Sequence, residues 1–143
     1  MKNNILIMFL TVNDYQMTIR QDILQTITDN QQNVRTQAER TAQATMESYL
    51  RNHYDVVQIF STEGAARNPL IVTYMMDITL YHILSRISPN NIPELRNNRY
   101  LDAIDWLKRV SRGDISPDLP SKGEEVKSGY LRLGSASKQS SYW

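Results

Sequence analysis

Residues 68–87, NPLIVTYMMDITLYHILSRI, decide the fold of this chain. Asn68 and Pro69 predict a helix start, because asparagine is a good N-cap and the missing amide hydrogen of proline costs nothing at the first helical position. The helix expected over residues 69–87 is apolar on nearly all sides, with interruptions at Thr73, Asp77, Thr79, His82 and Ser85. Such a helix must be central, so either the domain wraps it completely or a neighbouring subunit covers part of it.

Helical patterns also precede this segment. Thr11 and Asp14 resemble a capping box, which predicts a helix whose apolar spacing continues to about Thr28, before Asp29-Asn30 supplies a break and a second N-cap. An amphipathic helix is expected over about residues 31–52, with its charged side chains in solvent: Arg35, Glu39, Arg40, Glu47 and Arg51. Residues 56–60 are expected to be briefly extended, and residues 61–64 to form a turn.

The last helix is expected to begin after Ser88-Pro89, capped by Asn91 with Glu94, and to end near Arg112. Gly113 then supplies a left-handed stop. The apolar stripe of this last helix consists of Leu95, Tyr100, Ala103, Ile104, Leu107 and Val110. On the other side Asp105 is placed to meet Arg109 one turn later, a pair worth about 0.2–0.5 kcal/mol.

These patterns predict an all-α fold, a small bundle of about four to five helices with extended arms at both ends. The expected division is an N-terminal segment over residues 1–10, a helical domain over residues 11–113 and a C-terminal arm over residues 114–143. The arm is rich in Ser, Gly and Pro, and its isolated apolar residues cannot offset about 1–2 kcal/mol of backbone ordering per residue. It therefore needs another surface on which to dock.

Composition excludes several classes of chemistry. The chain has 143 residues, 41% hydrophobic and 22% charged, with a net charge of +1, two histidines and no cysteine. Disulfides, thiolate metal sites and cysteine nucleophiles are therefore absent, and two histidines cannot build a multi-histidine cage. The near-neutral balance argues against coating nucleic acid through bulk charge but leaves room for a local basic face.

The amino-terminal apolar run at residues 5–10, ILIMFL, is too short for a secretory signal and fits a short strand or an extended arm. No stretch reaches the length of a membrane span, so we expect the protein to be soluble in the cytosol or in an assembly built there, without membrane contact.

No catalytic constellation stands out. Asp77 and His82 are five residues apart, so they diverge by about 140° around a helix and cannot face one site. His53 beside Asp55 is the other candidate, and local hydrogen bonding explains each of these residues more simply. Gly-rich phosphate loops, a nucleophile elbow and HExxH are missing. We therefore expect no enzyme, no catalytic residue, no metal and no cofactor.

The candidate functional residues are those of an interface. Basic residues of the last helix could form a patch beside Tyr100 and Trp106, although Asp102 and Asp105 dilute it: Arg96, Arg99, Lys108, Arg109 and Arg112. Trp106 lies at the flank of the apolar stripe, where it is either an interface anchor or is packed under a neighbouring loop. Aromatic and aliphatic residues of the arm favour contact with a partner: Tyr130, Leu131, Leu133, Tyr142 and Trp143.

Several stretches resemble the Mu gp36-like family of phage proteins. The resemblance begins with FLT at residues 9–11 and YLRNHYD at residues 49–55, and continues with RNP at residues 67–69 and DITLYH at residues 77–82. It extends through IPE at 92–94, RY at 99–100, DAIDWL at 102–107, VSRG at 110–113 and SPDLP at 116–120. It covers about residues 8–120, which makes Met8 an alternative start to Met1.

The resemblance implies a structural role in a virion. The family is grouped with head–tail connector, or adaptor, proteins, small helical subunits that form a ring, commonly dodecameric, beneath the portal of a tailed phage. It implies no enzymatic activity. The implied partners are other copies of the chain, the portal protein and the next neck or tail protein, with non-specific contact to passing DNA, in a neck assembled in the host cytoplasm.

A ring requires two different side surfaces on each subunit, because head-to-tail contacts that close by rotation are heterologous. The central helix and Trp106 could supply them. We expect Arg109 and Arg112 either to meet acidic rims of neighbouring proteins or to line the passage for DNA. The alternative from another class is a small helical DNA-binding or regulatory module whose last helix contacts phosphate, and a steep loss of duplex binding with salt would identify it.

Overall fold

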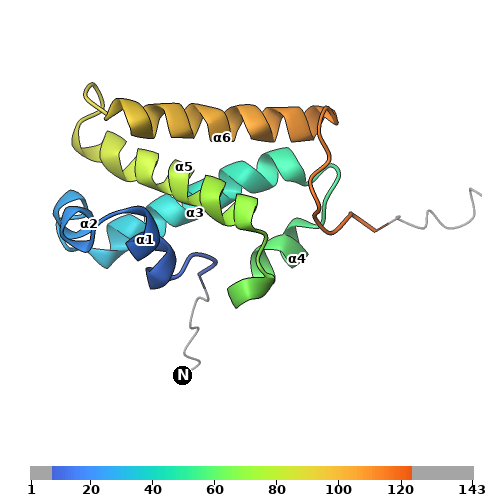
Figure 1. Ribbon diagram of the computed structural model, residues 1–143, viewed down its shortest axis with the longest axis horizontal. Coiled ribbons are helices and arrows are strands. Elements are labelled where there is room, and N and C mark those ends of the chain that lie inside the picture. Colours follow the sequence, from blue (N-terminus) through green and yellow to red (C-terminus); the bar gives the residue numbers. More distant parts are fainter. Residues whose placement is uncertain (1–7, 124–143) are drawn as a thin grey trace, which may run out of the picture.

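The computed structural model describes residues 8–123 (Figure 1). This part of the chain contains six α-helices and a short 3₁₀ turn, Gly64–Ala66, and no strand. The helices are α1 (Val12–Thr18), α2 (Gln21–Ile27), α3 (Gln32–Leu50), α4 (Val56–Ser61), α5 (Pro69–Ile87) and α6 (Glu94–Arg112). The predicted all-α bundle is confirmed, with slightly more helices than the four to five expected.

The body consists of the three long helices, and α5 is its centre. Helix α5 packs against α3 and α6 as well as against the short helices α1 and α2. Figure 1 shows α6 along one side of the molecule, α5 and α3 crossing beneath it, and α1 and α2 beside one end of α3. The buried residues of α5 include polar ones and point in several directions, as the sequence predicted: Ile71, Met75, Met76, Asp77, Ile78, Thr79, Leu80 and Ile83.

Three predicted helix ends are confirmed in atomic detail. Thr11 and Asp14 form a complete capping box at α1. The Asn68 side chain accepts hydrogen bonds from the amides of Leu70 and Ile71, with Pro69 at the first position of α5. Gly113 ends α6 in the left-handed region, at φ 81°. Each of these helix ends is fixed either by a side chain that accepts hydrogen bonds from the unpaired first-turn amides or by a residue that tolerates positive φ.

Other expected boundaries were wrong. The helix expected to run from Thr11 to Thr28 is two helices, because Ile19 and Arg20 are extended between α1 and α2. The extended piece expected at residues 56–60 is α4, whose first turn is capped by Asp55 accepting from the amide of Gln58 at 3.0 Å. The local hydrogen bond from Asp55 outweighs the β-branched Val56-Val57.

Two predicted N-caps were also wrong. Asp29 and Asn30 do form the predicted break, both at positive φ, but Gln31 is the N-cap of α3 and makes no side-chain capping bond. Pro93, rather than Asn91, is the N-cap of α6. The expected ion pair between Asp105 and Arg109 is likewise absent from the part of α6 that the structure describes, where both side chains are exposed.

Both ends of the described chain lie against the helices. Phe9 and Leu10 are buried in the core, and no strand forms there; residues 5–7 of the apolar run lie outside the described residues. After α6, Leu119 is buried and Ile115 packs on the core. The amide of Asp55 donates to the carbonyl of Pro120 at 2.9 Å, and the backbone amide of Lys122 donates to the carbonyl of His53 at 3.1 Å. The first part of the predicted arm therefore contacts the body of its own chain.

Candidate functional site: a charged hollow between α1, α5 and α6

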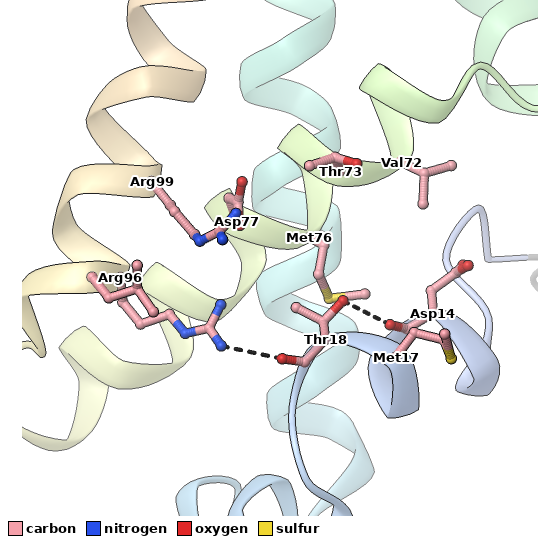
Figure 2. A pocket seen from close by; sticks show the side chains of 10 residues that line it. Asp14, Met17, Thr18, Val72, Thr73, Met76, Asp77, Arg96 and Arg99 are labelled. Atoms are coloured by element: carbon pink, nitrogen blue, oxygen red, sulfur yellow. Dashed lines mark hydrogen bonds between the residues drawn. The ribbon is translucent and has the colours of Figure 1, made fainter.

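A surface hollow of about 440 Å³ lies where α1, α5 and α6 meet. Helix α6 contributes its first turns and α5 its first half, while the end of α1 closes a third side. Figure 2 shows Arg99 extending from α6 toward Asp77 on α5, and Arg96 reaching toward Thr18 at the end of α1. The lining residues are Asp14, Met17, Thr18, Val72, Thr73, Met76, Asp77, Leu95, Arg96 and Arg99.

Asp77 is the buried charge of the hollow, only 5% exposed. Burial raises the pKa of its carboxyl above the usual value, although the positive charges of Arg99 and Arg96 act in the opposite direction. These guanidinium groups act at longer range than an ion pair. Arg96 instead donates to the carbonyl of Thr18 at the end of α1, at 3.2 Å, which joins α6 to α1 across the hollow (Figure 2).

A second carboxylate at the rim, Asp14, is already paired. Arg67, just before α5, donates two hydrogen bonds to Asp14, at 2.6 and 3.0 Å, and a third to the carbonyl of Phe9. Burial alone would raise the pKa of Asp14, but the hydrogen bonds from Arg67 and Thr11 outweigh it and hold the pKa below the usual value. This fork-like pairing fixes α1 to the segment that enters α5.

Apolar side chains project beside these charges. Met17 on α1 is 81% exposed and Leu95 on α6 is 58% exposed, and both line the hollow. Leu95 belongs to the predicted apolar stripe of α6, but it lines this hollow at the surface, whereas Ala103, Leu107 and Val110 of the same stripe are buried. Two arginines over a buried carboxylate, flanked by exposed apolar side chains, suit the binding of an acidic and apolar protein surface.

The structure separates the predicted basic residues into two groups. Arg96 and Arg99 line the hollow, whereas Arg109 and Arg112 are in the last turn of α6, where both are exposed. At 1.5 Å per residue, about 20 Å of helix separates Arg96 from Arg109. The four arginines therefore do not form one continuous patch.

Trp106 packs on the central helix of its own chain. Its ring is half-buried and lies 4.9 Å from the ring of Tyr74 on α5. Two turns earlier, Tyr100 stacks on Tyr81 at 3.8 Å. These two aromatic pairs join α6 to α5. The other predicted contact residues, Tyr130, Leu131, Leu133, Tyr142 and Trp143, lie outside the described residues.

A buried polar cluster at α3 was missed from the sequence. Glu39, expected in solvent, is 2% exposed and accepts a hydrogen bond from the hydroxyl of Tyr15 at 2.5 Å. Arg35 lies over the Tyr15 ring and 3.7 Å from Glu39. Burial raises the pKa of Glu39 despite the Tyr15 hydrogen bond and the nearby Arg35 charge. Glu39 is next to the buried Ala38 on α3, but the sequence does not show that α1 covers this part of the helix.

The two residue pairs considered for catalysis are separated or used locally. Asp77 lines the hollow, whereas His82 borders a different depression beside α3. A ring nitrogen of His53 lies 3.1 Å from the carbonyl of Ser111, and Asp55 caps α4. In residues 8–123 no group of three or more His, Asp or Glu side chains is placed to hold a metal ion.

Comparison with known proteins gives one family. Residues 9–132, most of the chain, match the family described as Bacteriophage Mu, Gp36. No curated protein and no solved structure matches the chain. Among the described residues, no helix has the length and apolar character needed to cross a membrane. On the extent of the family match, the chain is a phage protein that belongs to the Bacteriophage Mu, Gp36 family.

Proposed function

We propose that this protein is a structural subunit of a tailed-phage virion, a head–tail connector of the adaptor or head-completion type. Copies form a ring beneath the portal and join the head to the tail. The observation that carries the proposal is the family match over residues 9–132. The partners are other copies of the chain, the portal protein and the next neck or tail protein, and the ring is placed in the neck of the virion.

The surface of the fold supports an assembly role. Large apolar side chains are exposed on five of the described helices, including Met17 on α1 at 81%, Val57 on α4 at 77% and Leu95 on α6 at 58%. A small helical body with apolar side chains on separate faces can contact two neighbours through different surfaces, which a closed ring of identical subunits requires.

The chemistry of the described residues supports a role other than catalysis. Of the candidate catalytic residues, His53 contacts the carbonyl of Ser111 and Asp55 caps α4, while Asp77 and His82 lie at different places on the surface. The charged hollow offers arginines and apolar side chains, a combination that recognises surfaces. We therefore propose that the protein is not an enzyme.

The test is loss and restoration of the gene in a tailed phage that carries it. Without this protein, electron microscopy should show filled or partly filled heads and free tails that are not joined, and the wild-type chain supplied in trans should restore joined particles. The protein should also be found in purified virions. Normal joined particles in its absence would contradict the proposal.

The alternative, a helical DNA-binding module, is supported by the exposed basic side chains of Lys108, Arg109 and Arg112 at the end of α6. The salt dependence of binding to duplex DNA distinguishes the two functions, because binding through phosphate contacts weakens steeply as the salt concentration rises. A connector subunit should show no useful affinity of its own for random duplex DNA. Tight duplex binding at low salt that is lost at moderate salt would favour the DNA-binding module.

A further inference from the structure

Helix α4 carries an exposed apolar side chain at the margin of the body. Of its residues only Ile59 is buried, while Val57 is 77% exposed and Gln58 and Ser61 are also exposed. Figure 1 shows α4 beside the start of α5, outside the three long helices. The opposite side of α4 packs on the core through Val56, Ile59 and Phe60, so Val57 projects from a fixed helix and is available to contact another molecule.

The segment around α4 is acidic. Residues 52–66 contain Asp55 and Glu63 and no lysine or arginine, and the arginines on either side are paired with other carboxylates, Arg51 with Glu47 and Arg67 with Asp14. Glu63 is exposed directly after α4, and Asp55 caps the start of the helix. The surface that α4 presents therefore combines an apolar side chain with negative charge.

The hollow between α1, α5 and α6 has the complementary composition. Asp14 is paired with Arg67, which leaves one carboxylate, Asp77, and two arginines, Arg96 and Arg99, among the lining residues; Asp102 of α6, which also acts on Asp77, is not part of the lining. Arg99 is exposed, so its charge is accessible to a partner. Met17 and Leu95 supply exposed apolar contacts at the same place.

We propose that α4 of one copy of this chain docks in the hollow of the next copy, with Val57 against Met17 and Leu95, and Glu63 facing Arg99. The two surfaces are on different helices and have no residue in common, so the contact is heterologous and each subunit can use both surfaces at once. This inference rests on the proposed ring and names the surfaces that would build it.

The natural absence of cysteine allows a direct test. The double variant Val57→Cys/Leu95→Cys is supplied in trans to a phage that lacks the gene, and the purified particles are oxidised. The inference predicts a ladder of disulfide-linked dimers, trimers and larger species built from the 16.6 kDa chain. Either single variant alone should give no ladder, because each contact joins one Val57 surface to one Leu95 surface.

The matched control is Val57→Cys/Leu101→Cys. Leu101 is exposed to a similar extent as Leu95 on the same helix, 53% against 58%, but does not line the hollow. Equal cross-linking of the two double variants, or no ladder with Val57→Cys/Leu95→Cys, would overturn the inference. Particles that contain the chain but give no specific ladder refute this contact alone, whereas wild-type particles that lack the chain refute the proposed function.

Charge exchange gives a second, independent readout. Glu63→Arg and Arg99→Glu should each lower the yield of joined particles at least about tenfold, and the two changes combined should restore most of it, because opposite charges again face each other. Both side chains are exposed, so circular dichroism should show unchanged folding. Glu63→Arg combined with Arg109→Glu is the control and should restore nothing. Restoration by the control, or none with Arg99→Glu, would overturn the inference.

Discussion

The Glu39 carboxylate shows how one side chain departs from its sequence pattern. It lies at a charged position of an amphipathic helix, yet it is buried between α3 and α1 with the Tyr15 hydroxyl as its hydrogen-bond donor. The periodicity of one helix places a residue on a face but does not show where another helix will cover that face. A buried carboxylate with a raised pKa is costly in its charged form, so its environment can be tested by substitution.

Tyr15→Phe should lower the free energy of unfolding at pH 7 by about 1–3 kcal/mol, because it removes the hydrogen-bond donor and leaves the Glu39 carboxylate as a buried acceptor without a donor.

Glu39→Gln keeps a hydrogen-bond acceptor at this position without the charge. Since the pKa of Glu39 is raised from 4.5 in the folded state, wild type should lose stability relative to Glu39→Gln as pH rises above 4.5. Urea unfolding across this range measures both effects. A pH-independent difference between wild type and Glu39→Gln would contradict the burial of this carboxylate.

The contribution of Asp14 to stability should depend on pH in the opposite direction to that of Glu39. The folded pKa of Asp14 is lowered from 3.8, so its contribution to stability is present above 3.8 and is lost as pH falls through the folded value. Asp14→Asn should therefore be less stable than wild type at pH 7, and the difference should shrink as the pH is lowered below 3.8. Acid unfolding of the two proteins followed by circular dichroism provides the measurement. A difference that persists unchanged at the acid end would contradict the pairing with Arg67.

At the scale of elements, the sequence predicts best where a side chain makes the boundary. Thr11, Asn68 and Gly113 act within a turn of their own position, so three helix ends were predictable. The start of α6 was not predictable in the same way, because its N-cap, Pro93, makes no side-chain capping bond. Helix α4 was missed because its β-branched residues favour a strand, while tertiary contacts and the Asp55 cap select a helix.

Substitution of Asn68 tests how much its N-cap contributes to the start of α5. Its Oδ1 accepts from the first-turn amides of α5, and its Nδ2 donates to the carbonyl of Asp118 at 3.2 Å. Asn68→Ala should destabilise the protein by about 1 kcal/mol or more, since it loses the cap and that contact. Asn68→Asp keeps the capping oxygen and should be less damaging. Thermal unfolding of the two variants ranks them, and equal losses would show that the cap contributes nothing.

For the whole molecule, the sequence identified the central helix and part of the site. Arg96 and Arg99 were singled out as interface residues, but their neighbour Asp77 belongs to another helix, and only the packing of α6 on α5 and α1 brings the three together. The sequence pattern allows Trp106 either an interface role or internal packing, and the structure shows its ring against that of Tyr74. Helical periodicity contains no information on the crossing of helices, so such neighbours could not be predicted.

Charge reversal at the end of α6 tests a role in the assembled neck. Arg109 and Arg112 are exposed, and Arg112 lies 4.0 Å from Asp114 at the helix end. Arg109→Glu combined with Arg112→Glu should leave folding intact but reduce ring stacking or DNA retention, because the reversed charges repel acidic rims or DNA. The fraction of joined, DNA-filled particles provides the measurement. Normal particles from the double variant would remove this role.

The most direct test of the connector assignment is native mass spectrometry of the purified full-length chain, alone and then mixed with the portal protein of the same phage. We predict that several copies of the 16.6 kDa chain bind together to one portal assembly, with a mass increment that corresponds to a closed ring. A chain that stays monomeric and unbound in the presence of portal would contradict the account.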